Sequence, residues 1–115
     1  MSRNTKPISW VKAARKAFET FPQAAQIQVL RALTVAAEGE KADIAKPMKG
    51  LGAGVYEIAV KVRTDAYRAV YALRVGEAIW VVHAFQKKSR KGMETPKHEI
   101  EVIKERIKRL KETLQ

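Results

Sequence analysis

Basic side chains gather around turns in the middle of the sequence. Lys61 and Arg63 precede one turn, Arg68 follows it, and Lys87 and Lys88 end a later apolar run. Cations that a fold brings together can bind the phosphate groups of a nucleic acid. A basic surface that only keeps the protein dissolved is the alternative for any single lysine. We prefer a phosphate-binding groove because Lys61, Arg63 and Arg68 flank the same turn.

The charge of the whole chain agrees with this interpretation. Its 115 residues contain 23 Lys and Arg against 12 Asp and Glu, which gives a formal net charge of +11 at pH 7. Residues 46–91 alone hold ten basic residues and three acidic ones. An excess of this size indicates a polyanionic partner.

The sequence has few of the residues that disulfides, metal sites or cofactor-binding loops require. The chain has no Cys, which excludes disulfides and thiolate metal sites, and its two histidines, His83 and His98, have no carboxylate cluster beside them. His83 lies in an expected strand and is interpreted as a packed histidine. The segment GLGAG lacks the spacing of a dinucleotide-binding loop. We therefore expect neither a metal nor a cofactor.

The sequence has no segment typical of a secreted or membrane protein. No apolar stretch follows Arg3 and Lys6, and the longest uncharged apolar run, AIWVVHAF, is too short to span a bilayer. One domain, residues 1–115, is expected at this length. These features predict a cytoplasmic protein that does not bind membranes.

The first half of the chain predicts a strand followed by a helical hairpin. Residues 7–11 alternate as an edge strand does, residues 12–20 suit a helix, and a second helix starts at Pro22 and ends before Gly39. The apolar stripe expected on this second helix consists of Ile27, Leu30, Leu33 and Ala37. Residues 40–54, rich in glycine, are expected to form a loop.

The second half predicts an antiparallel meander and a final helix. One face of the strand expected at residues 54–63 is apolar, and strands at residues 67–75 and 78–86 follow across short turns. The other face of the first of these strands carries Glu57, Ala59, Lys61 and Arg63.

Thr95 and Pro96 are read as the N-cap and first residue of a C-terminal helix. Its apolar stripe consists of Ile100, Ile103, Ile107, Leu110 and Leu114. The order of elements favours an α+β fold whose antiparallel sheet has about four strands.

Three stretches of the sequence resemble a known family. MKGLGAGVYEI, YRAVY and HAFQKKSRKGMETPKHEI are similar to parts of the phage-derived branch of the RelE/HigB-like toxins of bacterial type II toxin–antitoxin systems. The resemblance covers nearly the whole chain. It implies a small RelE-like fold, with an N-terminal helical hairpin and a C-terminal helix around the sheet.

The resemblance also implies a metal-independent endoribonuclease that enters the ribosomal A site and cuts messenger RNA there. The 2′-OH of the RNA would attack the phosphate and leave a 2′,3′-cyclic phosphate and a 5′-OH. Basic residues suit this reaction because negative charge collects on the phosphate oxygens. The implied partners are the ribosome with its messenger RNA and a cognate antitoxin, expected to be a helix-turn-helix DNA-binding protein.

The family's pattern suggests roles for individual residues. Arg68 matches the arginine of the family's YR strand and is assigned to the phosphate. Lys61 and Arg63 fall where relatives carry basic residues and are assigned to transition-state charge and to proton transfer. The expected catalytic set is Lys61, Arg63, Arg68 and Lys88. Contacts with RNA or the ribosome are expected from Lys49, Lys87, Arg90, Lys91 and His98.

Two positions depart from the family's pattern. Ala59 stands where the best-known relative has lysine, and no tyrosine follows Lys88 to stack on a base. The general acid and base therefore stay open, with His98 as one candidate because imidazole titrates near pH 7. Two other functions also stay open. One is a toxin of the same fold that acts on another target, such as DNA gyrase, and the other is a phage-associated nucleic-acid-binding protein without enzymatic activity.

Overall fold

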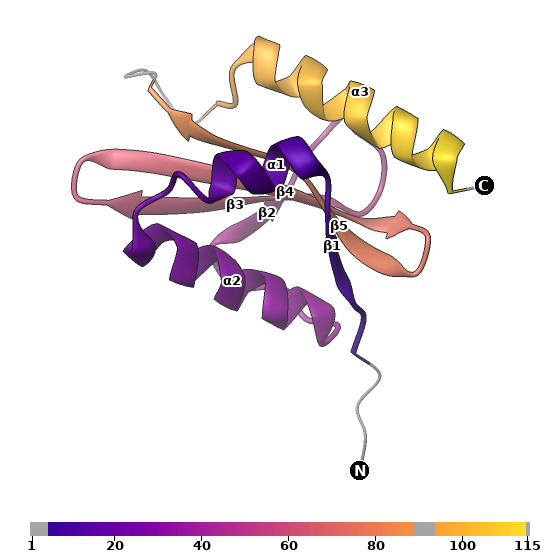
Figure 1. Ribbon diagram of the computed structural model, residues 1–115, viewed down its shortest axis with the longest axis horizontal. Helices are drawn as coiled ribbons and strands as arrows, with labels where there is room; N and C mark the ends of the chain where they lie inside the picture. The colour runs from indigo at the N-terminus through magenta and orange to yellow at the C-terminus, as the bar shows by residue number, and fades with distance from the viewer. Residues whose placement is uncertain (1–4, 89–93, 115) are drawn as a thin grey trace.

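Alternating apolar residues build a five-stranded sheet with helices on both faces in the computed structural model, which describes residues 5–88 and 94–114. The strand order is β1-β5-β4-β3-β2. The strands are β1 (Ile8–Trp10), β2 (Ala45–Pro47), β3 (Val55–Val62), β4 (Asp65–Val75) and β5 (Ala78–Lys87). The helices are α1 (Lys12–Phe18), α2 (Gln23–Ala37) and α3 (Lys97–Thr113). In Figure 1, α3 lies above the sheet and α2 lies below it.

Strands β3, β4 and β5 form the antiparallel meander that the sequence predicts. Val62 pairs with Asp65 across a two-residue turn, which sets the register of the first hairpin. β1 pairs in parallel with β5, so the sheet is mixed and not purely antiparallel. Part of the segment expected to be a loop forms β2, which pairs with the outer edge of β3. The α+β class is confirmed, with five strands among the described residues where about four were expected.

The first core lies between the sheet and the helices α1 and α2. β3 and β4 contribute every second side chain to it, including Ile58, Val60, Ala69 and Tyr71, as a period of two predicts. Aromatic rings extend this core toward the N-terminal helices. Phe21 contacts both Phe18 and Tyr67, with ring centroids 5.9 Å and 4.9 Å apart.

The opposite face of the sheet, to which Glu57, Ala59 and Lys61 of β3 point, is partly covered by α3. Ile103 and Ile107 of α3 pack there against Val70 and Val82 in a second core. A bulge in β5 leaves Val82 without a partner on β4 and turns both Val82 and His83 toward α3. The basic side expected of β3 therefore belongs to a face on which β4 and β5 carry a hydrophobic core under α3.

The buried face of α2 matches the predicted stripe only in part, at Leu33 and Ala37. Ile27 and Leu30 are 43% and 45% exposed, whereas Leu33 of the predicted stripe is fully buried. The buried face consists of Ala25, Val29, Ala32, Leu33, Ala36 and Ala37. Alanines allow the helix axis to approach the sheet closely. The larger apolar residues alone therefore did not reveal which face packs.

The two leucines of α2 provide a direct test of this orientation. Leu33→Ala should lower the free energy of unfolding by about 2–5 kcal/mol because it leaves a cavity in the first core. Leu30→Ala, one turn away on the exposed side, should change it by less than about 0.5 kcal/mol. Urea denaturation of both variants measures the difference. Equal losses would show that the outer face of α2 also packs against something.

Candidate functional site

Three basic residues expected to act together lie on one face of the sheet. Lys61 of β3 and Lys87 of β5 both pair with Ala66 of β4, so the two lysines stand on either side of it. Arg68, two residues further along β4, points to the same face. This is the face that α3 covers further along, and the three residues occupy its end nearest the β3–β4 turn. We call this region the basic corner.

The members of the basic corner differ in their access to solvent. Lys61 is exposed, whereas Arg68 and Lys87 are 6% and 7% exposed. Burial of two cations in one region requires nearby acceptors, because a desolvated charge without partners is costly. Lys61 is therefore the member that an approaching anion meets first.

Glu57 supplies the acceptor for Arg68. Its Oε1 accepts a hydrogen bond from Nη1 of Arg68 at 2.8 Å, and the two side chains are 13% and 7% exposed. Its Oε2 accepts a hydrogen bond from the hydroxyl of Thr95 at 2.6 Å. The sequence pattern gave Glu57 no role, although the turn at residues 63–64 sets the register that brings it near Arg68.

Thr95 does not have the role that the sequence predicts. The N-cap of α3 is Pro96, the helix begins at Lys97, and no side chain among the described residues caps its first turn. The Thr95 hydroxyl bonds to Glu57 of β3 instead. The predicted N-cap is therefore wrong, because the helix begins one residue later and the Thr95 side chain is turned toward Glu57 instead of the first turn. The segment before α3 is in this way attached to the basic corner.

Lys46 is a further cation on this face that the sequence did not reveal. It is exposed and pairs with Glu57 across β2 and β3, so both side chains point to the α3 side. The sequence contained no usable signal for it, because residues 45–47 were read as part of a loop. Its position next to Glu57 adds a second exposed lysine to the basic corner.

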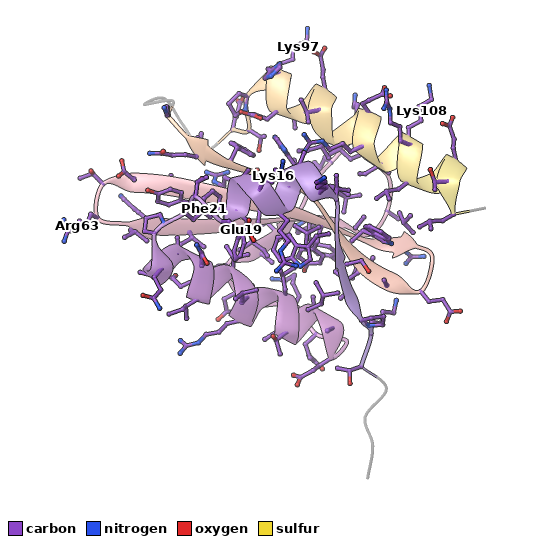
Figure 2. The ribbon with its side chains drawn as sticks, in the orientation of Figure 1. Lys16, Glu19, Phe21, Arg63, Lys97 and Lys108 are labelled. Carbon is purple, nitrogen blue, oxygen red and sulfur yellow. The ribbon has the colours of Figure 1, made fainter. Side chains whose placement is uncertain are left out.

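Arg63 lies outside the basic corner. β3 ends at Val62, and Arg63 is the first of the two turn residues, with a φ of 58°. Figure 2 shows it at the tip of the β3–β4 hairpin, pointing away from the helices. The expectation that it shares the strand face of Lys61 is therefore wrong. A non-glycine residue in this left-handed region costs about 1–2 kcal/mol, which the short turn imposes.

The other predicted site residues that the structure describes are the catalytic candidate Lys88 and the contact candidates Lys49 and His98. Lys88 is exposed directly after β5, and Lys49 is exposed after β2, at the far edge of the sheet. His98 is exposed in the first turn of α3 and lines a shallow groove of about 360 Å³. Arg90 and Lys91 lie outside the described residues. The structure thus brings together Lys61, Arg68 and Lys87 and leaves Lys49 apart from them.

His83 is a buried histidine with both ring nitrogens hydrogen-bonded. Nδ1 accepts a hydrogen bond from Nη1 of Arg106 at 3.0 Å, which requires Nδ1 to be unprotonated. Nε2 therefore carries the proton and donates to Oε1 of Glu99 at 2.6 Å. Burial lowers the pKa of His83, and the positive charge of Arg106 adds to this effect against the opposing influence of Glu99. The ring joins β5 to α3, as expected of a packed histidine.

Three further observations concern proton transfer, metal binding and membrane insertion. Burial raises the pKa of Tyr71 to about 12, so this phenol in the first core stays protonated. Among residues 5–88 and 94–114, no three His, Asp or Glu side chains come together as a metal site requires. In the same part of the chain, no helix has both the length and the apolarity needed to cross a bilayer.

Comparison with known proteins defines the class of this fold. A mutant of the E. coli toxin RelE in the free state superposes with a TM-score of 0.60 at 19% sequence identity. The match covers 91% of this chain and 97% of that one. Residues 16–108 match the family described as phage-derived protein Gp49-like (DUF891). The chain belongs to this Gp49-like family and has a RelE-like toxin fold, which confirms the family expected from the sequence. No curated protein is significantly similar to it in sequence.

The ion pair between Glu57 and Arg68 should contribute strongly to stability. Arg68→Met leaves Glu57 buried without its cation, and we expect it to lower the free energy of unfolding by about 3–5 kcal/mol. The double variant Glu57→Leu/Arg68→Met removes both charges and should lose less than Arg68→Met alone. As a control, Arg109→Met breaks the exposed pair with Glu105 and should cost less than about 1 kcal/mol. Glu57→Leu alone completes the double-mutant cycle, and strictly additive effects of the two substitutions would contradict a coupled pair.

Protonation of His83 should make stability depend on pH. The unfolded chain binds this proton near the usual pKa of 6.5, whereas the folded protein binds it only at lower pH. Just below pH 6.5 the unfolded state therefore binds more protons than the folded state. As the pH is lowered through this range, the free energy of unfolding decreases until the pH reaches the pKa of His83 in the folded protein. His83→Gln should flatten this part of the stability profile, and His98→Gln should not. A profile unchanged by His83→Gln would rule out this cause.

Proposed function

We propose that this protein is the toxin of a type II toxin–antitoxin pair and acts as an endoribonuclease on messenger RNA in the ribosomal A site. Membership of the Gp49-like family and the RelE-like fold support the toxin class. The observation that carries the proposed activity is the basic corner, where Lys61, Arg68 and Lys87 share one face beside a carboxylate. In this setting the protein acts in the cytoplasm, where ribosomes are.

The proposed reaction needs charge stabilisation and two proton transfers. The RNA 2′-OH attacks the adjacent phosphorus, the bond to the 5′ oxygen breaks, and a cyclic phosphate and a 5′-OH result. Arg68 and Lys87 stabilise the negative charge on the phosphate oxygens. Glu57, which holds Arg68 at 2.8 Å, is our candidate for accepting the 2′-OH proton. Lys61 is exposed and is assigned to the leaving 5′ oxygen, which takes up a proton.

Substrate has to reach an arginine that an internal carboxylate already holds. An RNA phosphate is an anion like Glu57, so it can share the guanidinium or displace the carboxylate from it. Thr95 donates to the other carboxylate oxygen, and any movement of Glu57 must therefore break that contact as well. The ribosome is the partner that would hold the RNA long enough for this exchange.

The same positive charges suggest which partners the protein binds. Lys49, Arg90, Lys91 and His98 remain proposed contacts with ribosomal or messenger RNA. Lys88, expected in the catalytic set, is proposed here as a further contact of this kind. An antitoxin that inhibits the protein would cover the basic corner, and acidic residues would suit it for this contact. We expect that antitoxin to be a helix-turn-helix DNA-binding protein.

Mapping of 5′-OH ends in messenger RNA on translating ribosomes tests this function. Lys61→Ala should reduce the cleavage rate about 100-fold or more, because it removes a cation used in the transition state. Lys61 is exposed, so the substitution should leave the fold intact. The control is Lys108→Ala, which removes an exposed lysine on α3, away from the basic corner.

A second variant addresses Arg68 while keeping a partner for Glu57. Arg68→Lys retains the charge but not the planar guanidinium, and it should also reduce cleavage. If the wild type and both variants give the same 5′-OH ends, the basic corner is not the catalytic site. Intact messages together with broken DNA would instead indicate a gyrase-directed toxin.

A further inference from the structure

A groove of about 630 Å³ runs along the β1 edge of the sheet, beside α1. Its walls include Trp10, Trp80 and the basic residues Lys12, Arg15 and Lys16. We propose that this groove is a second nucleic-acid site, which binds a short single-stranded segment by base stacking and phosphate contacts. It is distinct from the basic corner, to which it contributes no residue.

The electrostatics of the groove favour an anion. Arg15 pairs with Glu19 at 3.3 Å, which offsets one of the three positive charges. Lys12 and Lys16 are exposed and lie one turn apart on α1, so they are neighbours on the helix surface. Figure 2 labels Lys16 and Glu19 on this helix. Two adjacent ammonium groups suit consecutive phosphates of one strand.

The aromatic residues make the groove suitable for bases in particular. Trp10 is half-buried and packs on Phe18, with ring centroids 4.8 Å apart, so the core holds its indole in place. Trp80 is half-buried on the neighbouring strand β5, where it pairs with Ser9 of β1. Aromatic side chains already held in position bind bases of any sequence by stacking, and they do so most readily in single strands.

Two other grooves of the molecule lack this combination. The groove beside His98 contains two glutamates and no Trp, Tyr or Phe. The groove between the β2–β3 loop and α3 contains Lys104, Lys108 and Lys111 but again none of these aromatic residues. Those lysines can attract a polyanion, yet no residue lining that groove can stack on a base. The β1 groove is therefore the better candidate for a nucleotide.

Intrinsic fluorescence reports on this site directly, because Trp10 and Trp80 are the two tryptophans of the chain. Titration of the full-length protein with an oligouridylate of about eight nucleotides should quench the emission as bases stack on the indoles. Lys12→Ala/Lys16→Ala should weaken binding about tenfold. It should also reduce the slope of log affinity against log salt by about 1.4, at 0.7 for each lost phosphate contact.

Three further variants show whether the oligonucleotide binds in this groove or on another basic surface. Lys104→Ala/Lys108→Ala removes a matched pair of exposed lysines from α3 and should leave the quenching curve unchanged. Lys61→Ala should also leave it unchanged, so loss of cleavage and loss of groove binding can be told apart. Trp80→Leu, checked for folding by urea denaturation, should weaken binding of a labelled oligonucleotide about tenfold.

Two outcomes would overturn the proposal. The first is binding that Lys12→Ala/Lys16→Ala leaves intact, because the phosphate contacts would then lie elsewhere. The second is equal binding of a polyglutamate peptide of the same charge, with the same quenching. That result would identify a docking site for an acidic protein segment in place of a nucleic acid.

Discussion

The ion pair between Glu57 and Arg68 is the interaction on which the candidate site depends. It joins adjacent strands at a place where both side chains are largely removed from water. Two charges tolerate such burial only when each is the partner of the other and further hydrogen bonds satisfy the remaining groups. Thr95 provides one of these bonds and so attaches the segment before α3 to the sheet. A single carboxylate thereby orients the arginine to which we propose that the substrate phosphate binds.

The position of α3 divides one face of the sheet into two regions with different roles. Over one region, Ile103 and Ile107 complete a hydrophobic core, and His83 adds a hydrogen-bonded connection to Glu99 and Arg106. The other region, nearest the β3–β4 turn, holds the charged residues. The second core, which stabilises the fold, and the basic corner, which carries the proposed chemistry, thus lie next to each other on the same strands. The register of those strands positions the residues of both.

The groove beside α1 and the basic corner use positive charge in different ways. In the basic corner, cations lie close to a carboxylate and two of them are largely buried, which suits stabilisation of charge at one phosphate. In the groove, exposed lysines accompany indoles, which suits weak and sequence-tolerant contact with a strand. A net charge of +11 attracts polyanions to the whole surface. Only the local surroundings distinguish one basic region from another.

Local patterns predicted much of this protein. The period of two in β3 and β4 identified the residues of the first core, and the turn residues identified the meander, because both depend on neighbours in the sequence. The same patterns failed for α2, whose packed face is rich in alanine, and for β2, whose three residues have no recognisable strand signal. They also misplaced Arg63, since a one-residue error at the end of a strand changes which way a side chain points.

What the sequence by itself determined was the α+β class, the basic character of the middle strands and the resemblance to a toxin family. Only the tertiary structure decided that Arg68 is held by Glu57, that Thr95 bonds to β3 and that Lys46 joins the basic corner. Strand pairing brings Lys46 and Arg68 beside Glu57, whereas the segment before α3 brings Thr95 there. The β3–β4 turn sets the register behind the contact of Arg68 with Glu57, but the other two depend on where α3 and β2 lie, which the spacing of residues along the chain does not encode.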